Sequence, residues 1–239
     1  MTVQDDLINF RDGTTVFSLL PKNEGRFCCF CDKKTACKLK FNTRCSNLGT
    51  QYFVWKVRYS MTRAETTKFL GDLLIVRFKD RTYWAREVSI DYGTSRVKRV
   101  DFMQFEPAGV IYQSDIEKGI FTCYEIKSCK EDVYSGNGLN LLGEKNYIVT
   151  TMQCYKDIQP DIRSGKLWKH IQECNPESLG QYGIMVPVPY GRELTDEYEN
   201  PTELTADREW EIKVIMPCYQ KGRKRSTTEL LFCMLRSGK

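Results

Sequence analysis

The feature that most constrains this chain is a cysteine cluster in residues 27–45. This segment, FCCFCDKKTACKLKFNTRC, holds five of the eleven cysteines of the 239-residue sequence. Cys28 and Cys31 have the CxxC spacing, whose tight turn points two thiolates at one tetrahedral metal ion. Cys37 and Cys45 are the natural second pair, and Cys29 is an alternative ligand. We therefore predict a structural zinc site in an N-terminal knob; reduced thiols packed as small hydrophobic groups are the alternative.

The start of the chain bears on the redox state of these thiols. The first thirteen residues contain no cationic segment followed by an apolar one, so no secretory signal is expected. No stretch approaches the roughly 18 apolar residues that span a bilayer. These features predict a protein of the nucleus or cytoplasm that is not secreted and has no membrane partner. Thiols stay reduced there, and eleven cysteines cannot all pair, so metal ligands are favoured over disulfides.

Basic residues accumulate around the cysteine cluster. Residues 22–58 contain nine Lys and Arg against two acids, whereas residues 192–211 contain eight acids against two Arg. Because the net charge of the whole chain is only +5, this local clustering is the stronger indication of a polyanionic partner. A solvated outer face of a sheet is the alternative interpretation. The residues expected to contact nucleic-acid phosphates are Lys33, Lys34, Lys38, Lys40, Arg44, Lys56 and Arg58.

Strand-like patterns dominate the rest of the chain. They predict an α+β fold that is predominantly antiparallel β, with one or two short helices and the cysteine-rich knob at its N-terminus. A capping box at Thr62–Glu65 starts one helix, over residues 63–70, and residues 160–174 form the other. Residues 1–60 would be the cysteine-rich basic region and 61–239 the β-rich body, or the two would form one domain. The expected strands are 14–20, 51–59, 72–78, 82–90, 96–102, 110–113, 119–126, 147–155, 183–189 (an edge strand), 209–216 and 230–235.

Three of these strands form an expected β-meander over residues 71–104. Its second strand begins Tyr83-Trp84-Ala85-Arg86, and it thereby resembles Tudor domains and other small SH3-like barrels. The resemblance implies an aromatic cage from Tyr83, Trp84 and Tyr92 that binds a methylated cation. Core and turn aromatics are the alternative. In Tudor domains an Asp-Tyr-Gly step follows the third strand, whereas Asp91-Tyr92-Gly93 precedes it here.

Other segments carry weaker signals. The Gly136-x-Gly138 pair could let backbone amides approach a phosphate, but the Walker lysine is missing. Residues 193–207 are an expected solvated acidic loop, and residues 221–225 carry four cations that suit either a nucleic-acid patch or a charged hairpin. His170 is the one histidine, so a Cys–His enzyme would need it, with Cys123, Cys129, Cys154 or a clustered cysteine as nucleophile. No nucleophile motif accompanies it.

Two functional hypotheses follow from these patterns. The first is a nucleic-acid-binding protein with a structural zinc site and a basic surface, on DNA or RNA. The second is a regulatory or protein-interaction module built on the meander, with its acidic or aromatic surface facing a protein partner. A closed shell of four thiolates leaves no open position on the metal, so the zinc would fold the knob without catalysing a reaction. The sequence favours no enzyme class.

Metal analysis tests the predicted zinc site. We expect about one Zn²⁺ per chain in protein purified under reducing conditions, and a loss of that metal in a Cys28→Ser, Cys31→Ser double variant, because thiolates supply the whole shell. A Cys233→Ser variant, which changes a cysteine far from the cluster, is the control. A folded wild-type protein without zinc would contradict the prediction.

Overall fold

The computed structural model describes residues 61–78, 83–109, 111–178 and 181–237, and the backbone of three short strands nearer the N-terminus. The chain divides into two compact units, Met1–Tyr59 and Ser60–Lys239. In the first unit, β1 (Leu7–Asn9), β2 (Thr15–Phe17) and β3 (Phe53–Trp55) form an antiparallel sheet in the order β1-β2-β3. The cysteine cluster and the seven basic residues predicted to bind phosphate lie outside the described residues.

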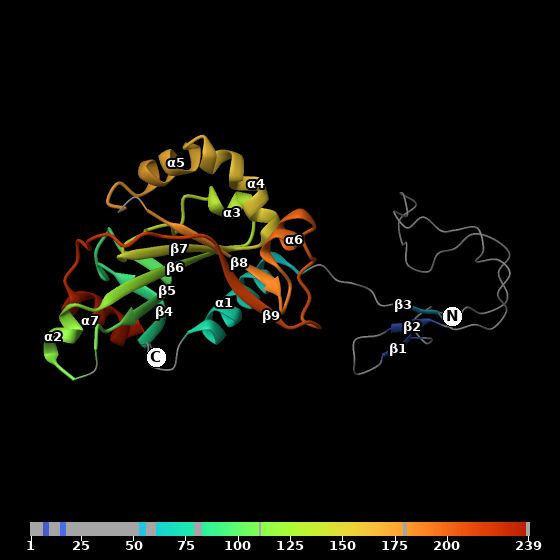
Figure 1. The fold of residues 1–239 in the computed structure, drawn as a ribbon, viewed down its shortest axis with the longest axis horizontal. Coiled ribbons are helices and arrows are strands. Elements are labelled where there is room, and N and C mark those ends of the chain that lie inside the picture. The colour runs from blue at the N-terminus through green and yellow to red at the C-terminus, as the bar shows by residue number, and fades with distance from the viewer. Residues whose placement is uncertain are drawn as a thin grey trace. The chain divides into compact units, whose positions relative to one another are not determined.

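A six-stranded mixed sheet forms the centre of the second unit (Figure 1). Its strands lie side by side in chain order. The pairs β6–β7 and β7–β8 are parallel, and the pairs β4–β5, β5–β6 and β8–β9 are antiparallel. Each parallel pair is joined by helices, as crossover connections require. The strands are β4 (Tyr83–Ile90), β5 (Lys98–Glu106), β6 (Ile120–Lys127), β7 (Lys145–Thr150), β8 (Gly183–Pro189) and β9 (Trp210–Met216).

The expectation of a predominantly antiparallel β protein with one or two short helices is wrong. The described residues contain seven helices, and the fold is α+β-like, with a mixed sheet whose pairs are mostly antiparallel and whose central pairing is parallel. The helices are α1 (Arg63–Arg77), α2 (Gln113–Glu117), α3 (Lys130–Val133), α4 (Met152–Arg163), α5 (Lys166–Cys174), α6 (Leu194–Glu199) and α7 (Thr227–Ser237). None of the helices described is long and apolar enough to cross a membrane.

The segment 72–78, predicted as a strand, belongs to α1. The predicted capping box is present, since Thr62 and Glu65 exchange backbone and side-chain hydrogen bonds. Gly71 does not end the helix. A Cβ at Gly71 would lie 3.3 Å from the Phe102 ring, so this glycine allows the helix to approach the sheet closely. Leu70 and Leu74, four residues apart, bury the same helix face. The three-stranded Tudor-like meander is therefore absent, because only β4 and β5 of its predicted strands exist.

Five further predictions need correction. Residues 230–235 are helical in α7, residues 152–155 begin α4, and residues 111–113 of the predicted strand 110–113 contain no strand. Short apolar runs fit either a buried strand or one face of a helix, which explains the first two errors. Residues 183–189 do form a strand, but β8 lies between β7 and β9 and not at an edge. Within the acidic segment, residues 194–199 form α6, whose Glu197 is buried beside Arg192.

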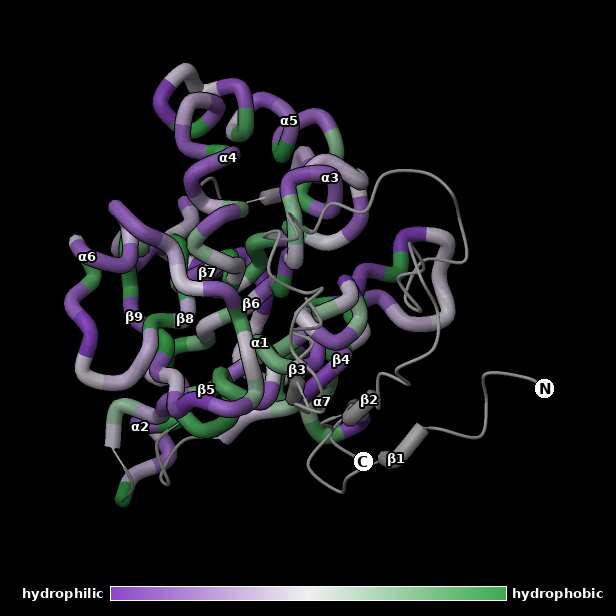
Figure 2. Tube along the Cα trace, turned by 90° about the vertical axis from the view of Figure 1, so that its right-hand side faces the viewer, coloured by the Kyte–Doolittle hydropathy of each residue, from purple (hydrophilic) through white to green (hydrophobic). Residues whose placement is uncertain are grey.

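Three clusters of apolar side chains hold the sheet and its helices together. Helix α1 packs Leu70 and Leu74 against Phe102, Tyr124 and other residues of one face. Helices α4 and α5 cover β7 and β8 from the opposite side, as Figure 1 shows. In Figure 2 the strands beneath them carry hydrophobic stretches, whereas much of the surface of α4 and α5 is hydrophilic. Helix α7 closes the third cluster, against β4 and β5.

The basic segment 221–225 attaches α7 to the sheet. The Arg225 guanidinium donates two hydrogen bonds to Asp91, at 2.9 and 2.7 Å, and a third to Glu229. This contact lowers the pKa of the Asp91 carboxyl. Arg223 donates to Glu144 at 2.5 Å and to the carbonyl oxygen of Gly119. The predicted charged hairpin between two strands is wrong, because a helix follows. Three of its four cations, Arg223, Lys224 and Arg225, have structural partners.

Core packing of α7 can be tested by a matched pair of leucine truncations. Leu230 is fully buried in the β4–β5 cluster, whereas Leu235 is 75% exposed. We expect Leu230→Ala to lower the free energy of unfolding by about 2–5 kcal/mol, because it removes buried methyl groups and leaves a cavity. Leu235→Ala should change it by less than about 0.5 kcal/mol. Urea denaturation measures both, and equal effects would contradict the helical packing.

Candidate active site

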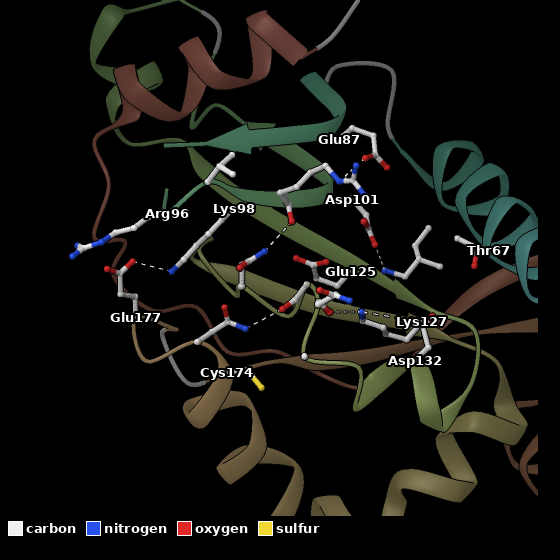
Figure 3. Close-up of a pocket in the computed structure, with 18 of the residues that line it drawn as sticks. Thr67, Glu87, Arg96, Lys98, Asp101, Glu125, Lys127, Asp132, Cys174 and Glu177 are labelled. Atoms are coloured by element: carbon white, nitrogen blue, oxygen red, sulfur yellow. Dashed lines mark hydrogen bonds and ion pairs between the residues drawn. The ribbon is translucent and has the colours of Figure 1, made fainter. Parts of the chain in front are cut away.

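A polar pocket of about 900 Å³ opens beside the ends of β5 and β6 (Figure 3). Its floor carries Asp101 from β5 and Glu125 and Lys127 from β6. Glu125 and Lys127 are two residues apart on one strand and so lie on the same face of the sheet. One wall comes from the start of α1 and the β4–β5 hairpin, and the other from residues 136–140 and 174–177.

Asp101 lies where strand pairing breaks on both sides of β5. The β5–β6 ladder begins at Phe102 opposite Tyr124. The β4–β5 ladder omits Glu87 and Asp101 from its pairs. Glu87 itself has a left-handed φ of +52°, a strained value for a residue with a side chain. The Asp101 carboxylate accepts the Ile126 N–H at 2.7 Å, which would otherwise lack its ladder partner. This local separation of β5 from β6 makes room for the pocket.

Glu125 is the most unusual group in the pocket. Its side chain is 1% exposed, and its Oε1 atom has no hydrogen-bond partner. Burial and the nearby Asp101 carboxylate raise the pKa of Glu125 to about 8, opposed in part by the Lys127 charge. Burial likewise raises the pKa of Asp101. An unpartnered buried carboxylate oxygen is costly, so its presence in the pocket points to a ligand that supplies the missing contact.

Lys127 is held in place beside these carboxylates. It is 5% exposed and donates to the carbonyl oxygen of Asn137 at 2.6 Å, with Asp132 at 3.9 Å. Asp132 in turn accepts from the Ser128 N–H and from Arg63, at 3.1 and 2.5 Å. Three elements, β6, α3 and α1, therefore fix the position of the ammonium group in the pocket.

The loop of residues 135–143 lies directly against the Glu125 carboxylate. A Cβ at Gly138 would lie 2.7 Å from Glu125 Oε2 and 3.2 Å from Lys127 Nζ, so a side chain there would displace both groups. Gly138 has a left-handed φ of +71°, which also favours glycine. Asn140 donates to the carbonyl oxygen of Arg99 at 2.8 Å, and Asn175 donates to the carbonyl oxygen of Gly138 at 2.9 Å. These bonds connect the loop to β5 and to the end of α5. In the sequence, the Gly136-x-Gly138 pair of this loop was a weak signal for phosphate binding.

Cations surround the pocket, and most of them are paired with acids at its rim. Lys98 pairs with Glu177 at 2.9 Å and Arg99 with Glu87 at 2.7 Å, while Arg63 contacts Asp132. Figure 3 shows Arg96 and Lys98 on one side of the opening and Lys127 beside Asp132 on the other. Among the ion pairs of the described residues, none includes Asp101 or Glu125. Two close carboxylates are thus left without a salt-bridge partner inside a basic rim.

This arrangement suits a hard divalent cation. No group of three or more acidic, His or Cys side chains with metal-binding geometry occurs in the described part of the chain. Mg²⁺ does not need one, because it is commonly held by one or two carboxylates, several waters and the oxygens of a substrate phosphate. Asp101 and Glu125 would be the two protein ligands. Bound there, the cation would supply the positive charge that these carboxylates lack.

Several groups named from the sequence lie elsewhere or do not come together. Tyr83 and Tyr92 are at opposite ends of β4, and Tyr92 is covered by the Arg236 guanidinium, so the aromatic cage does not form. Among the described cysteines, Cys174 contacts His170, with sulfur–nitrogen distances of 3.7 and 3.9 Å. Of the cysteines named as nucleophiles, Cys123 and Cys154 are buried, and burial raises the pKa of both thiols.

The sequence analysis missed Asp101, Glu125 and Lys127. A signal was present, since Glu125 and Lys127 are charged residues at alternate positions near the end of the otherwise apolar run 120–126. Charges on the inward face of a buried strand have to be explained by a partner or a ligand. Arg96, Lys98 and Arg99, which follow one another closely in the predicted strand 96–102, all line the pocket. Val97 between them is 52% exposed.

Comparisons with known proteins identify no relative. No family model, no curated protein and no solved structure matches this chain. The function has to be argued from the pocket itself.

The raised pKa of Glu125 predicts a pH-dependent stability of the metal-free protein. Between its ordinary pKa of 4.5 and the folded value of about 8, the folded state keeps a proton that the unfolded state loses, so stability falls as pH rises. In EDTA, we expect Glu125→Gln to raise the melting temperature at about pH 8 and to have little effect near pH 4.5. Each kcal/mol gained corresponds to about 2–4 °C.

The control for this stability measurement is Glu173→Gln, which neutralises an exposed carboxylate outside the pocket. Its effect on the melting temperature should not follow the same pH course. A Glu125→Gln variant less stable than wild type at every pH would mean that hydrogen bonds to the carboxylate, such as those from the backbone N–H groups of Asn140 and Leu139, outweigh the cost of burying it.

Proposed function

We propose that this protein is a divalent-metal-dependent nuclease that hydrolyses phosphodiester bonds at the Asp101–Glu125–Lys127 pocket. The observation that carries the proposal is the buried Glu125 carboxylate beside the half-buried Asp101 carboxylate, both without a salt-bridge partner and close to a fixed lysine. Without a bound cation, two such carboxylates lower the stability of the folded protein. The pair becomes favourable when a cation binds, which is typical of a catalytic site.

The chemistry assigns a separate task to each group. Asp101 and Glu125 would hold a divalent cation, which would supply Lewis-acid chemistry for the water and the phosphate. In the hydrolysis the water oxygen forms a bond to phosphorus, one P–O ester bond breaks, and the leaving oxygen takes up the proton that the water releases. Lys127, anchored by Asn137, would place its positive charge next to the phosphate and stabilise the charge that develops there. Nothing in this scheme requires a cysteine or histidine.

The surroundings of the pocket support a nucleic acid as the substrate. Arg63 and Arg99 have side chains 58% and 65% exposed at the rim, and Arg96 is exposed beside them. Such cations contact phosphates along a backbone and give affinity that falls with salt. The basic residues 33–58 would extend this affinity, and the predicted zinc knob formed by Cys28, Cys31, Cys37 and Cys45 would act as a binding module. The knob enters the proposal on sequence grounds alone.

The alternative hypothesis loses its structural basis. A regulatory or protein-interaction module built on a Tudor-like meander used a strand at 72–78, and those residues form part of α1. No observation on the described residues favours a particular protein partner.

Cleavage assays with labelled DNA and RNA test the proposal. We expect cleavage in Mg²⁺ or Mn²⁺ and none in EDTA. Asp101→Asn, Glu125→Gln and Lys127→Ala should each reduce the rate by about 100-fold or more, as expected when an electrostatic catalytic group is removed. Asp72→Asn, which neutralises an exposed acid paired with Lys68 on α1, should leave the rate unchanged.

Two results would contradict the nuclease proposal. One is the absence of cleavage with every metal and nucleic acid tested, in protein that is folded by circular dichroism. The other is full activity in the Glu125→Gln variant. Because this variant is expected to be at least as stable as wild type, lost activity cannot be assigned to unfolding.

A further inference from the structure

We infer that the nucleic-acid segment that reaches the pocket is single-stranded: a free strand, a flap or a frayed end, and not an intact duplex. This inference rests on the proposed nuclease function and specifies its substrate. It follows from three features of the pocket: the depth of the reactive groups, the links between its walls and its volume.

The groups that would act on the phosphate lie at the floor of the pocket. Glu125 and Lys127 are 1% and 5% exposed, and Asp101 is half-buried. The backbone at Gly138 lies against Glu125, so the loop covers part of the floor. The scissile phosphate therefore has to descend below the rim to meet the metal ligands.

The two walls of the pocket are linked above this floor. Lys98 on β5 pairs with Glu177 beyond the end of α5, at 2.9 Å. Asn140 of the loop donates to the carbonyl oxygen of Arg99 at 2.8 Å, also on β5. Lys224 donates to the carbonyl oxygen of Glu177 and holds that turn in place. Figure 3 shows Lys98 and Glu177 meeting on the side of the pocket away from α1. These links join the two walls, so the walls cannot separate further without breaking them.

A duplex does not fit such an opening. Its phosphates lie on the outside of a stiff double helix, with a persistence length of about 50 nm, so one phosphate cannot leave the surface without melting or sharp bending. The pocket volume of about 900 Å³ is that of a site for a small molecule, enough for a short piece of one strand. A single strand bends freely and can lower one phosphate to the floor while its neighbours contact Arg63, Arg96 and Arg99 at the rim.

Three labelled DNAs of one sequence test this inference with the full-length protein and Mg²⁺: the single strand, its blunt duplex, and the duplex carrying a single-stranded flap. We expect the single strand and the flap to be cut at least about tenfold faster than the duplex, with flap cuts confined to unpaired nucleotides. Cleavage of the duplex interior at a similar rate would overturn the inference and leave the nuclease function intact. No cleavage of any of the three would overturn the nuclease function and this inference with it.

A variant of the wall link sharpens the test. Glu177→Ala removes the partner of Lys98 without touching the three floor residues, so we expect the preference for the single strand over the duplex to fall by about threefold or more. Glu173→Ala, an exposed acid outside the pocket, is the matched control and should keep the preference. An unchanged preference in Glu177→Ala would contradict the role of the link in excluding duplexes.

Discussion

The buried carboxylate pair of Asp101 and Glu125 is the constraint on which the functional half of this structure depends. Two acids in one pocket repel each other, and burial removes the water that would stabilise their charges. The protein responds in part by keeping Glu125 protonated to about pH 8. Lys127 offsets some of the charge, but its ammonium is committed to Asn137 and lies toward Asp132. A bound divalent cation would neutralise the remaining negative charge of the two carboxylates, which is why we propose the metal site there.

The fold creates this pocket through a defect in its sheet. Where β5 would continue beside β6, the ladder stops at Phe102, and the Asp101 carboxylate takes the place of a backbone acceptor for Ile126. On its other edge β6 pairs with the parallel strand β7, and the connection between β6 and β7 supplies Asp132 and the Gly138 loop. The change from antiparallel to parallel pairing thus brings the chain back over the ends of β5 and β6. Active sites commonly lie at such irregular places.

Sequence patterns predicted the local elements well where one signal was clear. The capping box at Thr62 and the strands 82–90, 119–126 and 209–216 correspond to α1, β4, β6 and β9. Apolar runs such as 230–235 were ambiguous, because burial on a sheet and burial on one helix face use the same residues. The site was harder to predict. Glu125 and Lys127 share a strand, but Asp101 joins them only through the β5–β6 register, and the Gly138 loop only through tertiary contacts.

The ion pairs at the basic rim explain how the pocket can be stable without a nucleic acid and still bind one. Arg63, Lys98 and Arg99 each have a carboxylate partner, so the empty pocket does not carry a large unbalanced charge. Arg99 and Glu87 are both well exposed, and exposed ion pairs of this kind contribute little stability, typically about 0–1 kcal/mol. A polyanionic strand can therefore exchange this pair for phosphate contacts at small cost, while the Lys98–Glu177 pair stays as the link between the walls. The carboxylates at the floor have no such exchangeable partner, and so the rim is suited to holding the strand while the floor is suited to holding the metal.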